Sequence, residues 1–356
     1  MRAFNSSYQM RKLLYFGLLL LVSQYSKAQL GGRATYSFLD LVSNPRLAGL
    51  GGKATGFDEE DVAIGFWNAS MMRKEMGGQW NISHINFPVG INSGEAVYAH
   101  HVDKIGTFHA GFRMLDYGSF EASDFNGFVN GTFRAADYAL VLGGSTQLDS
   151  NWSIGAQLKI INSALEIYSS WGLATDFSAT YRIPEKRFAV SAVFRNIGTQ
   201  LTTYSGTREP LPFEVQLGIS NKFEHMPFRW HITLDNLQQW DVSYFNPALR
   251  QIDPITGEPI DQNVSLGQMF LRHLIVGAEF QPTQGFQVQV GYNFRRQAEM
   301  KMLTRRSSAG LSFGVGIRLF KIRFNYARTN YHVSGATNHL GVGVDLNRFK
   351  KQKSKL

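Results

Sequence analysis

The chain has 356 residues, of which 44% are hydrophobic and 13% aromatic, and it contains no cysteine. Disulfide bonds therefore contribute nothing to its stability, which has to come from packing and hydrogen bonding. The formal net charge of +9 lies mostly at the two ends, in four basic residues before position 29 and four lysines after position 349. Because the central part is nearly neutral, nucleic acid is not expected as a partner.

Residues 1–28 have the composition of an export signal. Basic residues precede an apolar run over residues 13–22, which is too short to span a membrane, and small residues follow at 26–28. We expect cleavage after Ala28, which makes Gln29 the mature N-terminus. No later stretch approaches the 18 or so uncharged apolar residues of a membrane helix, so a helical membrane protein is not expected.

Residues 29–78 show no strand-like alternation. They contain a glycine-rich run at 47–52, an acidic group at 58–61 and the motif Asn68, Ala69 and Ser70. A segment of such small and mixed residues is expected to lie in the lumen of a barrel as a plug. The alternative is a loosely ordered periplasmic extension.

From residue 79 to residue 349, apolar and polar residues alternate in stretches of about nine residues, as in 286–294. Side chains in a strand point alternately to opposite faces, so each stretch has one apolar and one polar face. A soluble sandwich would show similar patterning, but the signal, the many aromatics and the alternately short and long connections favour a lipid-embedded fold. We predict an all-β chain, a 14-stranded antiparallel transmembrane β-barrel. The expected strands are 79–87, 94–102, 105–117, 133–148, 151–166, 169–183, 187–201, 213–225, 228–241, 273–281, 286–297, 307–320, 322–330 and 337–347.

The connections predict the orientation of the barrel. Tight turns such as Asp103-Lys104 alternate with mostly longer connections near 118–132, 202–212, 242–272, 298–306 and 331–336. Bacterial barrels place short turns in the periplasm and long loops outside the cell. We therefore expect both termini to be periplasmic, with residues 350–356 as a basic tail. Five tryptophans near strand ends suit the membrane interface, although they could also pack between strands: Trp80, Trp152, Trp171, Trp230 and Trp240.

The longest connection, 242–272, is the candidate partner-binding loop. Aromatic residues and methionine are enriched in contact surfaces, and its prolines limit the ordering cost of binding. The alternative is a loop that folds over the barrel and packs only on itself. The candidate contact residues are Tyr244, Phe245, Met269, Phe270 and Leu271.

No arrangement of residues predicts catalysis. Residues 310–314 match the Gly-x-Ser-x-Gly pattern of serine hydrolases, but Ser312 lies within an alternating strand and no helical pattern follows it. The nine histidines lack metal-ligand spacing, and the acidic groups at 58–61 and 253–261 do not follow the calcium-loop pattern. We expect no enzyme activity, no cofactor and no bound metal.

Three stretches of the N-terminal region carry a family resemblance. Thr35–Leu41 and Arg46–Gly52 resemble the mature start of the PorQ branch of the PorV/PorQ family, and Asp61–Ser70 resembles the segment that ends the plug in that family. Ala69 stands where the family usually has proline. The fourteen-strand layout is similar to the FadL-type barrels to which this family belongs.

The resemblance implies an outer-membrane component of the Bacteroidetes type IX secretion system. It implies membership of a surface attachment complex in which PorZ is held near the PorU sortase and PorV. That complex processes cargo proteins and links them to lipopolysaccharide.

The FadL-type layout also allows a second hypothesis, the transport of hydrophobic small molecules through the barrel. Fold analogy is weak support for function. A continuous apolar pocket among plug and lumen residues would favour transport. The polar lumen faces argue against it, through Gln287, Gln289, Asn293, Arg318, Arg323 and Asn325.

Overall fold

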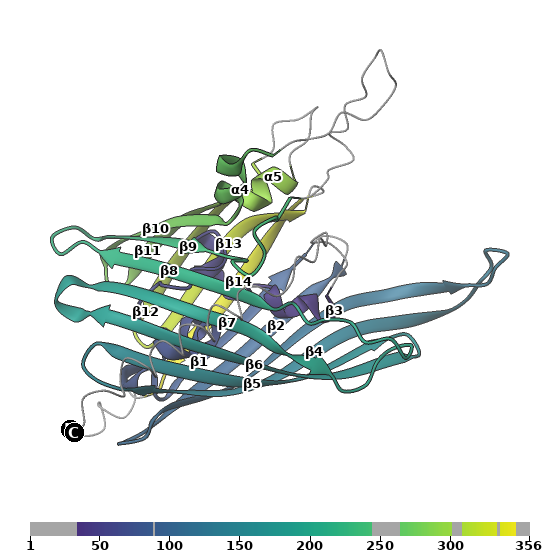
Figure 1. Ribbon diagram of the computed structural model, residues 1–356, viewed down its shortest axis with the longest axis horizontal. Coiled ribbons are helices and arrows are strands. Elements are labelled where there is room, and N and C mark those ends of the chain that lie inside the picture. The colour runs from purple at the N-terminus through teal and green to yellow at the C-terminus, as the bar shows by residue number, and fades with distance from the viewer. Residues whose placement is uncertain (1–33, 88–89, 244–263, 301–307, 333–334, 347–356) are drawn as a thin grey trace, which may run out of the picture.

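The computed structural model describes residues 34–87, 90–243, 264–300, 308–332 and 335–346. Among these residues, fourteen antiparallel strands form a closed barrel, in which chain neighbours pair and β1 pairs with β14 (Figure 1). The predicted fold is confirmed. The expected signal and basic tail lie outside the described residues and stay predictions. The strands are β1 (Gln79–Asn86), β2 (Asn92–Val102), β3 (Gly106–Ser123), β4 (Val129–Gln147), β5 (Trp152–Leu165), β6 (Tyr168–Ile183), β7 (Phe188–Gln200), β8 (Glu214–Lys222), β9 (Phe228–Leu234), β10 (Leu274–Thr283), β11 (Phe286–Asn293), β12 (Leu311–Leu319), β13 (Ile322–His332) and β14 (Gly335–Asp345).

The alternation in the sequence becomes two faces of the barrel wall. Val288, Val290 and Phe313 point outward and are 39%, 42% and 54% exposed, whereas Gln289 and Ser312 point inward and are buried. The outer face is thus apolar, as hydrocarbon requires, while closure of the ring pairs the backbone groups of the wall strands with one another.

The barrel has two distinct ends. At the short-turn end, tight connections such as 103–105 and 320–321 join consecutive strands. At the long-loop end lie the longer connections, including 201–213 and 235–273. These two names are used below for the two ends.

The five tryptophans expected at the membrane interface differ in position. Trp80, Trp152 and Trp171 lie near strand ends and are 44–48% exposed, whereas Trp230 is half-buried within β9. Trp240 lies beyond the end of its strand and stacks on the imidazole of His273, with 5.4 Å between ring centroids. Trp80, Trp152 and Trp171 therefore have the exposed position near a strand end that the membrane interface requires, whereas Trp230 and Trp240 do not.

The connection expected over 118–132 is largely strand. β3 and β4 run on into it and project beyond the rest of the barrel as a two-stranded arm, drawn in blue (Figure 1). The rings of Phe120 and Phe133 stack across the two strands with 5.3 Å between centroids, and the Asp124 carboxylate accepts two backbone N–H groups at the turn. Cross-strand aromatic pairing thus extends both strands into a stretch that was expected as a connection.

Two strands end earlier than expected. The strand expected over 286–297 ends at Asn293, because its side-chain oxygen accepts the backbone N–H three residues later and starts helix α5 (Phe294–Glu299). The strand expected over 228–241 ends at Leu234. In both cases the chain leaves the wall at the long-loop end.

A second helix, α4 (Leu266–Arg272), occupies part of the connection expected as a loop over 242–272. Ser265 and Gln268 form a capping box at its start, in which each side chain satisfies the backbone N–H of the other residue. α4 packs against α5 above the barrel rim (Figure 1). In the part of the chain that the structure describes, no helix is long and apolar enough to cross a membrane.

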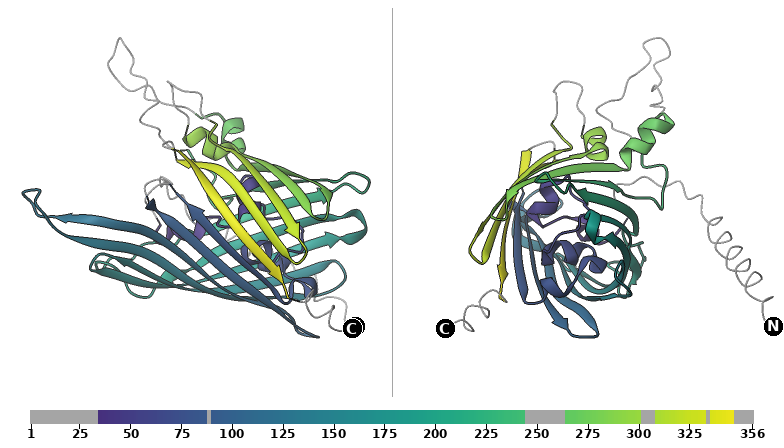
Figure 2. Two further views of the ribbon diagram at one scale, coloured as in Figure 1. Left: turned by 180° about the vertical axis from the view of Figure 1, so that it is seen from behind. Right: turned by 90° about the vertical axis from the view of Figure 1, so that its left-hand side faces the viewer.

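The N-terminal segment, defined here as residues 34–78, lies inside the ring of strands (Figure 2). Most of its residues are buried. Here α2 packs against β11 to β14, α3 against β1 and β2, and η2 against β4 to β6. The barrel therefore has a core between this segment and the inward side chains of its wall. The elements of the segment are η1 (Ser37–Asp40), α2 (Pro45–Gly49), α3 (Val62–Trp67), η2 (Ala69–Met71) and η3 (Lys74–Met76).

Candidate functional site

The candidate functional site is the surface on which the N-terminal segment meets the wall. The motif Asn68, Ala69 and Ser70 lies at its centre and is buried. The Ser70 backbone N–H donates to Ser178 Oγ at 2.9 Å, and its carbonyl accepts from Ser153 Oγ at 2.7 Å. Asn68 Oδ1 accepts both the backbone N–H and the hydroxyl of Ser70. Polar bonds to β5 and β6 therefore hold this motif against the wall.

Two wall glycines allow the segment to approach so closely. A β-carbon at Gly155 would lie 2.4 Å from the Ser70 backbone nitrogen, and one at Gly218 would lie 2.2 Å from the backbone nitrogen of Gly56. Both distances are shorter than a van der Waals contact, so no side chain fits. These inward glycines are part of the seat for the segment.

A buried ion pair joins α2 to β10. Arg46 Nε and Nη2 donate to the two carboxylate oxygens of Glu279, each at 2.7 Å, and both side chains are 1% exposed. Arg46 also reaches Glu59, which accepts from Arg229 Nη1 at 2.6 Å. Charge-assisted bidentate bonds of this kind are strong. Removal of either side chain would leave the other as an unpaired buried charge, which is costly. Nothing in the sequence pairs these residues, although the alternation places Glu279 on the lumen face.

Two buried lysines are also paired inside the barrel. Lys53 of the N-terminal segment contacts Glu214 at 2.5 Å and Asp235 at 3.5 Å. Lys159 of β5 contacts Asp176 of β6 at 2.7 Å. Charges in the lumen are therefore matched across elements, as buried charges require.

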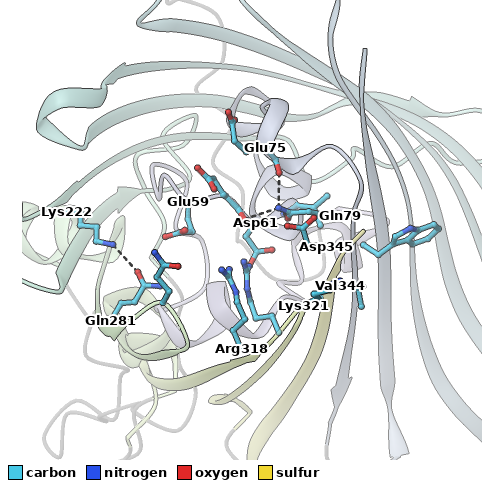
Figure 3. A pocket seen from close by; sticks show the side chains of 16 residues that line it. Glu59, Asp61, Glu75, Gln79, Lys222, Gln281, Arg318, Lys321, Val344 and Asp345 are labelled. Carbon is cyan, nitrogen blue, oxygen red and sulfur yellow. Dashed lines mark hydrogen bonds and ion pairs between the residues drawn. The ribbon is translucent and has the colours of Figure 1, made fainter. Parts of the chain in front are cut away.

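The short-turn end of the lumen is charged. A cavity of about 310 Å³ lies between the acidic part of the N-terminal segment and the wall, and Figure 3 shows Glu59, Asp61 and Arg318 directed into it. Arg323 of β13 pairs with Asp61 at this place. Burial raises the pKa of the Glu59 carboxyl, but Arg229 and Arg46 outweigh it and hold that pKa well below its usual range.

The long-loop end of the lumen contains an apolar, packed cluster. Tyr36, Phe38 and Leu39 of the N-terminal segment belong to one buried cluster with the wall residue Leu115 and with Leu211, from the β7–β8 connection. These side chains are at most 8% exposed. The lumen is thus filled at the long-loop end, where this cluster and the Lys53–Glu214 pair lie, and holds a charged cavity at the short-turn end.

The candidate partner residues are only partly brought together. Tyr244 and Phe245 lie outside the described residues. Met269 of α4 is 8% exposed and faces inward, whereas Phe270 and Leu271 are 46% and 41% exposed. The described part of this loop therefore presents two apolar side chains at the long-loop end.

The hydrolase-like motif is part of the wall. Ser312 lies on the lumen face of β12, paired with Thr329 of β13, and no strand-to-helix turn surrounds it. Residues 34–87, 90–243, 264–300, 308–332 and 335–346 contain no group of three or more His, Asp or Glu side chains able to hold a metal ion.

An apolar exterior, a closed ring and a filled lumen define the class as an integral outer-membrane β-barrel. No protein-family model and no curated protein sequence matches the chain. Among solved structures it is similar to the Pseudomonas putida toluene transporter TodX, with a TM-score of 0.50 and 12% identity over 85% of this chain and 97% of TodX. A Pseudomonas aeruginosa FadL homologue gives a TM-score of 0.46 at 12% identity, over 85% of this chain and 98% of the homologue. These neighbours are FadL-type outer-membrane barrels, and at this identity the likeness to TodX shows the fold alone.

Proposed function

We propose that this chain is an outer-membrane component of the type IX secretion system that anchors a surface attachment complex. The observation that carries the proposal is the filled lumen, in which buried ion pairs such as Arg46–Glu279 join the N-terminal segment to the wall. A barrel filled in this way suits an anchor better than a conduit. The residues that make these contacts fall largely within 35–70, the stretch that resembles the PorV/PorQ family.

In this proposal the long-loop end faces the cell exterior, and the short-turn end and both termini face the periplasm. PorZ is the direct partner, with PorU and PorV nearby, and lipopolysaccharide surrounds the outer rim. Phe270 and Leu271 of α4, with Tyr244 and Phe245 of the same loop, form the proposed PorZ contact. Met269 supports α4 from its buried side.

Affinity purification of the tagged full-length chain from a mild detergent extract of the native membrane tests the proposal. Recovery of PorZ, PorU or PorV is expected, and the F270S/L271S variant should retain less PorZ. F320S is the control, because Phe320 is 95% exposed at the opposite, short-turn end. Heat-modifiable mobility on gels verifies insertion. An inserted barrel recovered without any of these proteins would contradict the proposal.

A second candidate function is the passage of hydrophobic small molecules. The fold shared with TodX, described as a toluene transporter, favours it, and the comparisons support it more directly than they support a secretion role. The charged cavity at the short-turn end argues against an apolar path. Uptake of labelled toluene by cells with an intact lipopolysaccharide layer, with and without the gene, tests it. Uptake that depends on the gene would place transport first.

A further inference from the structure

The arm formed by β3 and β4 stands apart from the closed ring. β2 pairs with β3 only as far as Asp116, and β5 pairs with β4 only as far as Ala135. Beyond these points β3 and β4 pair with each other, and the Glu166 backbone N–H, which donates to the Arg134 carbonyl at 3.3 Å, marks the base of the arm. Both outer edges of the arm therefore lack a neighbouring strand among the described residues, and they project from the long-loop end (Figure 2).

Two of the usual means of protecting strand edges are absent from the arm. Proteins usually block exposed strand edges with proline, lysine or a covering element. Residues 117–134 contain neither proline nor lysine. Edges of this kind accept an extended segment of another chain through backbone hydrogen bonds.

An apolar cleft lies at the base of the arm. It has a volume of about 350 Å³ and is lined by the rings of Tyr117, Phe120, Phe133 and Tyr168, with Ala135, Leu165 and Glu166. The tip adds Phe125 and Phe128, which are 98% and 71% exposed. Apolar groups gathered in this way on an otherwise polar loop region mark an interaction surface.

The charge of the arm indicates the kind of occupant. Asp116, Glu121, Asp124 and Glu166 oppose the single cation Arg134, which leaves a formal charge of −3 on residues 116–134 and 165–168. An anionic lipid or lipopolysaccharide surface would be repelled. A protein segment that carries Lys or Arg beside apolar residues would be attracted.

We propose that the arm docks a protein partner, which adds an extended basic segment to one arm edge and places an apolar side chain in the cleft. The inference rests on the proposed function in one respect, since a surface anchor requires a partner at the long-loop end. The arm would be a docking site separate from the contact proposed on α4. Backbone pairing would provide affinity, and the cleft and the carboxylates would provide specificity.

Defined peptides test this site on the full-length chain in nanodiscs of zwitterionic lipid. The probes are a ten-residue peptide in which lysine alternates with valine and phenylalanine, its glutamate counterpart, and the lysine peptide N-methylated at alternate residues. We expect the lysine peptide to bind at least tenfold more tightly than either of the others. F120S/F133S should reduce its affinity at least tenfold, whereas F320S and empty nanodiscs serve as controls. Heat-modifiable mobility verifies that each variant is folded.

Several results would overturn the docking site. These are equal binding of the lysine and glutamate peptides, undiminished binding of the N-methylated peptide, or unchanged affinity in folded F120S/F133S. Toluene binding in the cleft without peptide binding would assign it to a small molecule, and self-association abolished by F120S/F133S would assign it to a second copy. Failure of peptide binding while PorZ still co-purifies would refute the arm alone. Loss of PorZ co-purification with intact peptide binding would count against the secretion role instead.

Discussion

The guanidinium of Arg195 on β7 lies 3.6 Å from the ring centroid of Trp67 at the end of α3. The same side chain donates to the backbone carbonyls of Trp67 at 3.0 Å and Leu39 at 3.2 Å. One wall residue therefore joins two parts of the N-terminal segment that are far apart along the chain. A planar cation can do this because it stacks and donates at the same time.

Replacing Arg195 by alanine should loosen the segment. It leaves the buried Trp67 carbonyl without a donor, whereas the Leu39 carbonyl keeps Arg113 Nη1 at 2.9 Å, so we expect a loss of about 1–3 kcal/mol in the free energy of unfolding. Urea titration in detergent, with gel mobility as the readout, measures it. The free energy of unfolding of R195K should lie between those of the native chain and R195A, because lysine keeps the charge without the planar stack. R208A, at an exposed site, is the control, and an equal effect of R195A and R208A would refute this role.

The Arg46–Glu279 pair should behave as a unit. E279Q is expected to lower the free energy of unfolding by about 3–5 kcal/mol, because it leaves a buried guanidinium without its bidentate partner. The double variant R46M/E279M should recover part of that loss, since it removes both charges. Thermal unfolding midpoints of the three chains test the coupling. D103N, which breaks an exposed pair with Lys74, should leave the midpoint unchanged. If E279Q lowers the unfolding midpoint no more than D103N does, the prediction is contradicted.

The seat for the segment should not tolerate a methyl group at Gly218. A β-carbon there would lie 2.2 Å from the Gly56 backbone nitrogen, so G218A requires the segment or the wall to move. We expect a cost above about 3 kcal/mol, beyond the usual range for overpacking, and faster cleavage of the N-terminal segment by protease. G131A is the matched control, because nothing lies within 4 Å of a β-carbon there. Equal rates of protease cleavage of the N-terminal segment in G218A and G131A would show that the segment is not seated at Gly218.

The contribution of Glu59 to stability should depend on pH. Its pKa is held below the unfolded value of about 4.3, so the stabilisation is present above the unfolded pKa and is lost as the pH falls through the folded pKa. The difference in unfolding midpoint between the native chain and E59Q should therefore be largest at neutral pH and shrink under acid conditions. Thermal unfolding across this range measures it. A difference that stays constant would contradict the ion pairing with Arg229 and Arg46.

The fold could be predicted where apolar and polar residues alternate with period 2 along the sequence. Alternation placed Gln289 inside and Val290 outside, because lipid on one face and a polar lumen on the other impose period 2 along each strand. The prediction was wrong at 118–132, where stacked Phe120 and Phe133 continue the strands. It was also wrong after Asn293, where a side-chain cap starts a helix.

The sequence by itself determined the barrel, its lipid-facing exterior and the separate character of residues 29–78, because these follow from composition and local period. The tertiary structure alone decided the site. Arg46 and Glu279 are 233 positions apart, and local pattern contains no information about which charges meet across a lumen. It also decided that the arm stands free of β2 and β5, because pairing between strands depends on their relative lengths in space.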